Sequence, residues 1–465
     1  MRSTILLACI FFSMLTTAQQ KYTPAELHQD LKVARQALEE AHAGFYRYRS
    51  KAETDKSFIK LEHQLNKDMT ELQFLKLLNP FLAGIKDGHT KFHRDGKPDD
   101  HYAFHEKGYF PFQLYFVNSR AFLRNSYLQD QTLESGTEII SINKQPISGV
   151  IKTLFNQIFA DGDVTSSKYQ ELNMYFEGYY ADYMGVSKSF QIGYMDSKGK
   201  KQTGTFPSVS KEQVKKEQPK EDPLKLSYPQ QGTALLRIPV FFEHIGNISF
   251  EDFLKNSFAE IRKHNISSLI LDLRDNEGGS EKLGILLYSY LSDTPFNYYD
   301  HLNVASKGPF SFAKHATFPP AMNEMLKYVE QDGGEFRFKM LPGLGLQQPQ
   351  PETFKGKVYL LQNGRSFSVT SEFAAIAKTN KRAILVGEES GGAYKGNTSG
   401  DFTRVSLPNT KLGLDIPLLA FHMHLKDPAV GHAGVPVDYF VLPTIADILK
   451  QRDVILEKTL TLIKP

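Results

Sequence analysis

The stretch Leu271-Asp-Leu-Arg-Asp-Asn-Glu-Gly-Gly-Ser280 decides the fold of this 465-residue chain. The apolar residues 268–273 predict a buried strand, the polar loop ends in paired glycines, and residues 283–291 predict a helix. Such a turn presents free backbone N–H groups at the start of a helix, where they can stabilise a negative oxygen. An ordinary glycine turn is the alternative. A dinucleotide or Walker phosphate loop does not fit, because neither glycine pattern is present.

Strand and helix patterns alternate through the second half of the chain. This alternation predicts an α/β layer, with helices packed on a largely parallel sheet. The predicted strands cover residues 234–240, 268–273, 357–362 and 382–387, and the predicted helices cover 250–263, 283–291 and 372–378.

A second strand-to-helix turn carries three serines. It reads Tyr359-Leu-Leu-Gln-Asn-Gly-Arg-Ser-Phe-Ser-Val-Thr-Ser-Glu-Phe-Ala-Ala375, with the serines at Ser366, Ser368 and Ser371. A serine at the head of a helix can expose its hydroxyl, and the N–H that follows it can serve as an oxyanion donor. The same residues also suit helix capping, which is a common role of serine. This segment by itself favours capping over catalysis.

The first half of the chain has a different pattern, with predicted helices followed by predicted strands. Thr23-Pro24-Ala25-Glu26 predicts a capped helix start, and a second helix over 71–85 is expected to end with Gly88 as its C-terminal cap. Residues 19–100 therefore predict a helical N-terminal region, and residues 101–208 a β-rich region. Residues 209–232, crowded with lysine, glutamate, glutamine and proline, predict a charged linker before the α/β core at 233–465.

The N-terminus and the composition limit the compartment and the class of protein. A charged Arg2, an apolar run at 5–15 and small residues at 16–18 predict a signal peptide over residues 1–18, and hence an exported, periplasmic or extracellular protein. Cys9, the single cysteine, would leave with that peptide, so no disulfide is expected. The 55 basic and 52 acidic residues give a net charge of +3, which argues against a nucleic-acid surface. No segment of the mature chain reaches membrane-spanning length without charges.

Several motifs together resemble one family. The LDLRDNEGG loop, the serine turn, Ile384-Leu-Val-Gly-Glu-Glu-Ser-Gly-Gly392, Gly434-Val-Pro-Val-Asp438 and the DGHT segment at 87–90 are similar to those of tail-specific, or carboxy-terminal-processing, serine peptidases. The resemblance includes the branch of the tricorn core and interphotoreceptor retinoid-binding protein. It implies a crotonase-like αβ peptidase core. It also implies that the β-rich region is a degenerate PDZ-like insert, a module that captures peptides by strand addition.

The resemblance also assigns roles to residues. It places the nucleophile at Ser368, with Ser366 and Ser371 as second choices, and the oxyanion donors at the N–H groups of Val369 and of Gly278 or Gly279. Two bases are open, because the family uses either a lysine or a histidine. His89 of the DGHT segment is preferred, since histidine titrates near neutrality, whereas Lys395 would have to be desolvated to act as a base. The residue that orients His89 remains open.

The sequence therefore predicts an exported serine peptidase that cleaves peptide bonds through an acyl-enzyme and acts on protein or peptide substrates. No cofactor or metal is expected: His422 and His424 have strand spacing and lack a nearby cysteine or glutamate partner. The competing prediction is a non-catalytic ligand- or peptide-binding protein on the same fold, because a fold does not guarantee activity.

Overall fold

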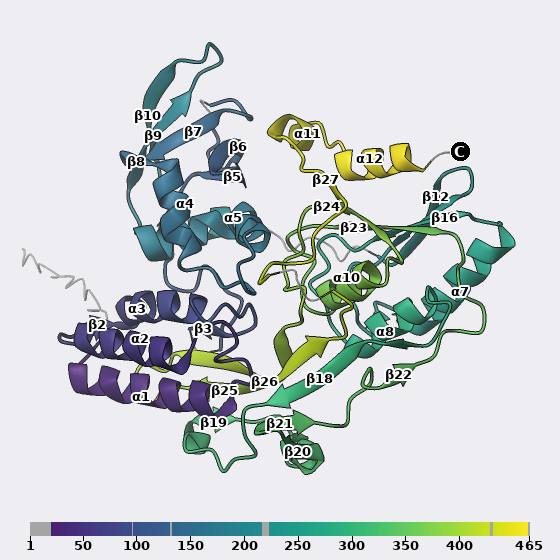
Figure 1. Ribbon diagram of the computed structural model, residues 1–465. Helices are drawn as coiled ribbons and strands as arrows, with labels where there is room; N and C mark the ends of the chain where they lie inside the picture. The colour runs from purple at the N-terminus through teal and green to yellow at the C-terminus, as the bar shows by residue number, and fades with distance from the viewer. Residues whose placement is uncertain (1–19, 95, 131–132, 216–222, 428–430, 464–465) are drawn as a thin grey trace, which may run out of the picture.

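The computed structural model describes residues 20–94, 96–130, 133–215, 223–427 and 431–463. The predicted signal peptide at 1–18, with Cys9, lies outside these residues. Figure 1 shows three parts: N-terminal helices at the lower left, a separate sheet with two helices at the upper left, and a larger α/β part on the right. Within the described residues, no helix is long and apolar enough to cross a membrane.

The N-terminal part contains the helices α1 (Pro24–Ala41), α2 (Lys51–Gln64) and α3 (Glu71–Ala83). Thr23 and Glu26 form the predicted capping box at the start of the first helix. The third helix ends at Ala83 with Gly84 as its C-cap, so the prediction of Gly88 as the cap was wrong. The short strands β1 (Lys21–Tyr22) and β2 (Met69–Thr70) pair beside these helices.

The middle part is an antiparallel sheet in the order β10-β9-β7-β6-β5, with two helices that the prediction of a β-rich region missed. One of them, α5, is kinked at Tyr175 and rich in aromatic residues, so its sequence lacks a clean helical stripe. The elements are β4 (Lys107–Tyr109), β5 (Phe112–Val117), β6 (Arg120–Ser126), β7 (Glu138–Ile142), β8 (Gln145–Pro146), α4 (Ile147–Phe155), α5 (Ser166–Tyr179), the π-helix η1 (Tyr180–Met184), β9 (Ser189–Met195) and β10 (Lys201–Pro207).

Part of the segment predicted as a charged linker is structured. β11 (Val209–Ser210) pairs with β4 of the middle part, and α6 (Lys211–Val214) follows it. β12 (Lys225–Gln230) joins the sheet of the core as an antiparallel edge strand.

The core contains the predicted α/β layer. Its sheet has the order β12-β13-β16-β23-β24-β27, and all pairs beyond β12 are parallel. Helix α7 and strand β23 have the predicted bounds. The strands are β13 (Thr233–Arg237), β16 (Ser268–Asp272), β23 (Lys357–Gln362), β24 (Ile384–Gly387) and β27 (Tyr439–Phe440); the helices are α7 (Phe250–Lys263), α8 (Glu281–Ser289), α10 (Val369–Thr379), α11 (Ile445–Leu449) and α12 (Val454–Leu462); and β14 (His244–Ile245) with β15 (Ile248–Ser249) form a small hairpin.

A second core sheet, which was not predicted, has the order β19-β25-β26-β18-β21-β20. It carries β3 (Lys91–His93) from the N-terminal part, paired with β26, so the loop before β3 is anchored to the core. The strands are β18 (Tyr299–Val304), β19 (Ala316–Thr317), β20 (Val329–Asp332), β21 (Glu335–Phe338), β25 (Thr398–Ser406) and β26 (Gly413–Met423), with β17 (Phe296–Asn297), β22 (Leu346–Gln347), α9 (Met322–Met325) and the 3-10 turns η2 (Ala313–His315) and η3 (Leu326–Tyr328) nearby.

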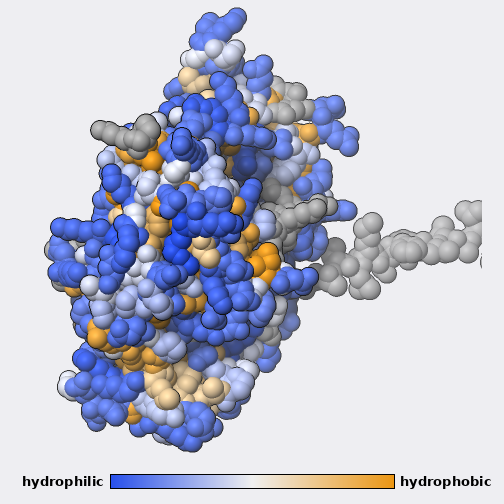
Figure 2. Space-filling view, turned by 90° about the vertical axis from the view of Figure 1, so that its right-hand side faces the viewer, coloured by the Kyte–Doolittle hydropathy of each residue, from blue (hydrophilic) through white to orange (hydrophobic). Residues whose placement is uncertain are grey.

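The hydrophobic core continues across the boundary between the N-terminal helices and this second sheet. One cluster combines Leu31 and Leu38 of α1 with Leu414 and Ile416 of β26. In contrast, the outer face drawn in Figure 2 is mostly hydrophilic, and its hydrophobic residues lie in scattered groups. The helical part is therefore packed as an integral part of the molecule, and the loops that it carries keep a fixed relation to the core.

Candidate active site

The two turns singled out in the sequence lie side by side. Strands β16 and β23 are parallel neighbours, with Asp272 opposite Leu361, so both strands end at the same edge of the sheet. The crevice outside the carboxyl ends of the strands is the usual ligand site of an open α/β sheet. The pairs that bond the turns to each other include Phe367 N–H to Asn276 O at 3.1 Å, Asn363 with Asp275 at 2.9 and 3.0 Å, and Arg365 with Glu277 at 2.7 Å.

Ser368 occupies the N-cap position of α10, but its side chain makes no capping hydrogen bond. Its backbone has φ 52° and ψ −126°, an unfavourable conformation for a residue with a Cβ atom. The side chain is half-buried, and Ser368 Oγ has no hydrogen-bond partner among the described residues. Strained backbone at the turn between a strand and a helix is also how nucleophile elbows expose a serine.

The other two serines of the turn have structural hydrogen bonds. Ser366 is fully buried; its Oγ donates to Leu273 O at 2.9 Å and accepts from Asn363 N–H at 3.0 Å. Ser371 is also buried, and its Oγ donates to Ser366 O at 2.7 Å. Both hydroxyls therefore hold the turn together, and Ser368 is the serine left with an unused hydroxyl.

The paired glycines lie directly against Ser368. A Cβ atom added to Gly278 would be 2.7 Å from Ser368 Cβ and 3.0 Å from the Val369 nitrogen. The Gly278 N–H donates to Asn276 Oδ1 at 2.9 Å, whereas the N–H groups of Gly279 and Val369 have no hydrogen-bond partner in the described chain. Backbone donors close to the serine are what an oxyanion hole requires.

His89 lies in the loop between α3 and β3. Its ring stacks on the ring of Phe367, the residue before Ser368, with centroids 4.5 Å apart and planes inclined by 30°. The side chain is 12% exposed, and its Nδ1 is 3.8 Å from Asp87 Oδ1, too far for a hydrogen bond. Burial lowers the pKa of His89 to about 4, although the charge of Asp87 acts in the opposite direction. At neutral pH the imidazole is therefore uncharged and able to accept a proton.

A buried carboxylate that the sequence analysis missed joins this loop to the core. Asp161 accepts hydrogen bonds from Gly88 N–H at 2.8 Å and from Ala393 N–H at 3.3 Å. Gly88 also has to be a glycine for space, because a Cβ there would be 2.8 Å from the Phe367 ring. No sequence motif marks Asp161, because it is brought to His89 only by the tertiary fold.

Asp87, His89 and Asp161 offer ligand atoms that lie within 4.8 Å of one another, a group that could hold a cation. The carboxylates are already engaged, since Asp161 accepts two backbone N–H groups and Asp87 accepts one from His89. Hydrogen bonds thus account for both carboxylates in this structure, and we assign no metal here.

Lys395, the alternative base, is fixed through its backbone. Its carbonyl accepts hydrogen bonds from Arg47 at 3.1 Å and from Met423 N–H at 3.2 Å. Within the described residues its ammonium group has no hydrogen bond or ion pair. The contacts of the structure connect His89 to the serine turn, and they show no such connection for Lys395.

Two open clefts border His89 and Phe367. One, of about 400 Å³, extends toward α3 and α5 and is lined by Tyr175, Tyr179 and Glu277. The other, of about 570 Å³, extends toward β25 and is lined by Phe318 and Phe402. A substrate chain could therefore approach the serine turn from either side of the imidazole.

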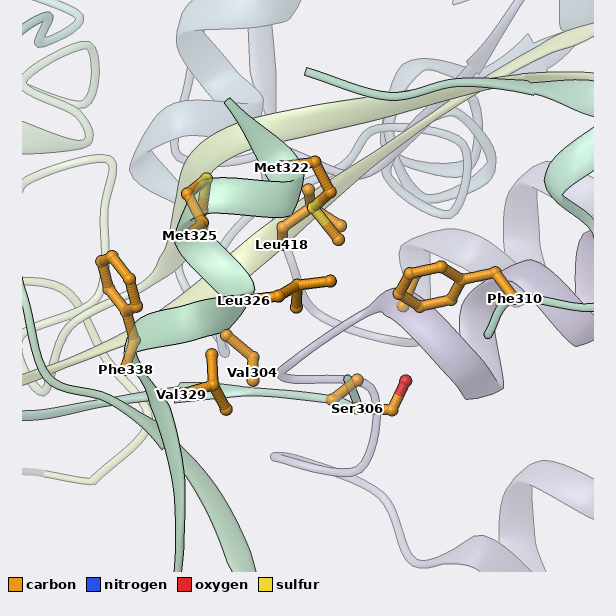
Figure 3. Close-up of a pocket in the computed structure, with 11 residues that line it drawn as sticks. Val304, Ser306, Phe310, Met322, Met325, Leu326, Val329, Phe338 and Leu418 are labelled. Carbon is orange, nitrogen blue, oxygen red and sulfur yellow. The ribbon is translucent and has the colours of Figure 1, made fainter. Parts of the chain in front are cut away.

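A third cavity is unsuited to chemistry. Figure 3 shows it between α9, η3 and the second core sheet, lined almost entirely by apolar side chains such as Met322, Leu326 and Phe338. It encloses about 10 Å³ and has no titratable side chain in its lining. It is a packing void of the core.

The chain is similar to known peptidases in part of its sequence and in its fold. Residues 232–421 match the family described as Peptidase family S41. The fold is similar to that of mature CPAF complexed with lactacystin, with a TM-score of 0.66 and 15% identity over 94% of this chain and 98% of that chain. A second structure of mature CPAF gives a TM-score of 0.63 and 15% identity over 94% and 97% of the chains. The photosystem II D1 C-terminal processing protease gives a TM-score of 0.41 and 14% identity over 92% and 97%. A search among curated proteins gave no match.

The family match covers both turns and most of the core around them, and the structural similarity to CPAF extends over nearly the whole chain. The match of residues 232–421 to peptidase family S41 supports a tail-specific protease and a serine-type peptidase.

Proposed function

We propose that this chain is an exported peptidase that cleaves peptide bonds through an acyl-enzyme on Ser368, with His89 as the general base. The observation that carries the proposal is the position of Ser368. Its hydroxyl is free of capping bonds, it lies against Gly278, and the residue before it stacks on His89. A nucleophile, amide donors and a neutral imidazole are the parts that acyl transfer requires.

In the proposed reaction, Ser368 Oγ attacks the carbonyl carbon of the scissile peptide bond and transfers its proton to His89. The Nδ1 atom faces Asp87, so Nε2 is the nitrogen left to exchange the proton. The N–H groups of Val369 and Gly279 would hold the oxyanion, and the Gly278 N–H could join them on leaving Asn276. The imidazolium then protonates the leaving amine, and water hydrolyses the ester by the same steps.

We further propose that the α/β part is a crotonase-like core and that the middle sheet is a PDZ-like module. Helix α5 packs beside the edge strand β5, as a helix does beside the peptide groove of such modules. The Asn173 side chain accepts the Phe116 N–H at 2.6 Å, so a peptide adding to this edge would have to displace it.

Cleavage of a generic unfolded protein substrate by the mature chain tests the proposal. The wild type should release new peptide ends, whereas Ser368→Ala and His89→Ala should lose the activity and keep their thermal unfolding midpoints. Substrate binding without cleavage by the wild type would instead favour the non-catalytic alternative.

Export has a separate test, because it depends on residues 1–18 alone. The full-length gene product should accumulate outside the cytoplasm, and mass spectrometry should find a mature N-terminus at Gln19. A cytoplasmic protein that retains its first residues would refute export and would leave the peptidase assignment intact.

A further inference from the structure

We infer that Asp87, held in place by His42, is the positioning residue that orients His89 and faces the charge formed on its ring. The inference rests on the proposed function, in which His89 is the base. It assigns the role of orienting His89, for which the sequence shows no motif.

His42 presents a proton to Asp87. It is the C-cap residue of α1 and is almost fully buried. Its Nδ1 accepts the Gly44 N–H at 3.1 Å, so the proton of the neutral ring must lie on Nε2. That nitrogen lies 2.7 Å from Asp87 Oδ2 and also 2.7 Å from Thr90 Oγ1, whose hydroxyl donates to the same carboxylate oxygen. The backbone at Gly44 therefore fixes the tautomer in which the Nε2–H of His42 faces the carboxylate and the Thr90 hydroxyl bound to it, so that His42 supports Asp87 both directly and through Thr90.

The remaining contacts of Asp87 lock its carboxylate in one orientation. Thr90 Oγ1 donates to Oδ2 at 2.7 Å, and the His89 N–H donates to Oδ1 at 2.9 Å. Burial alone would raise the pKa of Asp87, but the hydrogen bond and charge of His42, with His89 and Thr90, hold it below its usual range. Asp87 is consequently an ionised carboxylate at neutral pH, and its Oδ1 is the oxygen nearer to the imidazole.

Asp161 is the rival for this role, and two observations count against it. Its carboxylate oxygens are engaged by the N–H groups of Gly88 and Ala393, and it makes no ion pair with His89 within 4.0 Å among the described residues. Burial and the charge of Asp87 also raise the pKa of Asp161 to about 7, so it is partly neutral where Asp87 is charged. Asp161 therefore holds the loop of His89 against the core through hydrogen bonds, and Asp87 supplies the negative charge that faces the imidazole.

The geometry implies a closing movement during the reaction. The His89 Nδ1 to Asp87 Oδ1 distance of 3.8 Å is too long for a hydrogen bond, and Nδ1 has no hydrogen-bond partner among the residues that the structure describes. When Nε2 takes the serine proton, both ring nitrogens carry protons, and a small rotation of the ring lets Nδ1–H donate to Oδ1. Hydrogen bonds of catalytic groups are often long before substrate binds.

The test measures the rate of Ser368 modification by a fluorophosphonate from pH 3 to pH 9 in the full mature chain, so that it spans the acid limb set by His89. Asp87→Asn keeps an oxygen for the His89 N–H but removes the charge. We expect the rate at the plateau to fall on the order of 100-fold, and the acid limb of the profile to move to lower pH. The matched control is Asp30→Asn, because Asp30 is an equally buried carboxylate of α1 that accepts backbone N–H groups of Asn409 and Thr410. Asp30→Asn should keep the rate and the limb of the wild type.

A second variant covers the case in which Asp87→Asn does not fold. His42→Gln leaves the carboxylate in place and removes its imidazole donor, so it should slow the reaction about 10-fold and lower kcat on a peptide substrate without changing KM. A purely structural role for Asp87 would instead lower the fraction of labelled protein and leave the acid limb unmoved, which would overturn the inference. Failure of the wild type itself to react at Ser368 would refute the proposed function as well.

Discussion

Replacing Gly278 with alanine would place a methyl group between the loop after β16 and the serine turn. Gly278 has φ +105°, a conformation that residues with a Cβ atom rarely adopt. The added carbon would lie 2.7 Å from Ser368 Cβ, 3.0 Å from the Val369 nitrogen and 3.1 Å from Phe367 O. All three neighbours belong to the turn that we propose as catalytic.

The size of the effect follows from these contacts. Carbon atoms in van der Waals contact are about 3.5–4.0 Å apart, so the turn and the loop would have to separate by about 1 Å. A displacement of that size in an active site costs roughly 100-fold in rate. The backbone strain at φ +105° destabilises the fold separately, by about 1–3 kcal/mol.

The assay separates these two costs with Gly199→Ala as the control. Gly199 also has a positive φ, +72°, but no atom lies within 4 Å of its added Cβ. Gly199→Ala should show the stability cost of a positive φ without close contacts, and Gly278→Ala should lose more stability because of its added contacts. Only Gly278→Ala should lose about 100-fold in the rate of fluorophosphonate labelling of its folded fraction. Equal labelling rates for the two variants would refute the close packing of Gly278 on Ser368.

Three further predictions concern His89, Glu372 and Ser366. Because burial lowers the pKa of His89 to about 4, peptidase activity should stay level from pH 7 to pH 5.5; a steep loss centred near pH 6.5, or loss of activity in Lys395→Ala but not in His89→Ala, would contradict His89 as the base. Burial raises the pKa of Glu372 from its ordinary value of 4.5 to about 7. The Glu372 carboxyl therefore keeps its proton in the folded chain at a pH at which it has lost it in the unfolded chain, and the stability of the fold falls as pH rises from 4.5 to about 7. The difference in unfolding free energy between Glu372→Gln and the wild type, measured by urea denaturation, should therefore shift by about 3 kcal/mol in favour of the variant as pH rises from 4.5 to 8. A difference that does not change with pH would contradict this. Ser366→Ala should lose about 1–3 kcal/mol of stability while its folded fraction still labels at Ser368; loss of labelling at full stability would make Ser366 the nucleophile.

The core could be predicted from sequence because local and tertiary signals agree there. Strand β23 is a continuous apolar run, and α7 combines an apolar stripe with a serine cap at Ser249 and acidic residues in its first turn. The same applies to the capping box of Thr23. Such elements keep their bounds whatever the rest of the fold does.

The sequence-based predictions were wrong or incomplete where tertiary packing determines the structure. Helix α5 carries aromatic residues that favour strands and a kink at Tyr175, so its pattern does not indicate a helix. Gly88 resembles a cap, but its lack of a side chain instead makes room for Phe367. His42 and Asp161 contact the DGHT loop but lie in distant segments of the chain, so no sequence motif identifies them as its partners.

The most direct test of the account is the site of covalent modification. The mature wild type is treated with a fluorophosphonate, digested, and searched by mass spectrometry for the modified residue. The account predicts one adduct per chain, on Ser368, and none in Ser368→Ala. An adduct on Ser366 or Ser371, or equal modification of the two proteins, would contradict it.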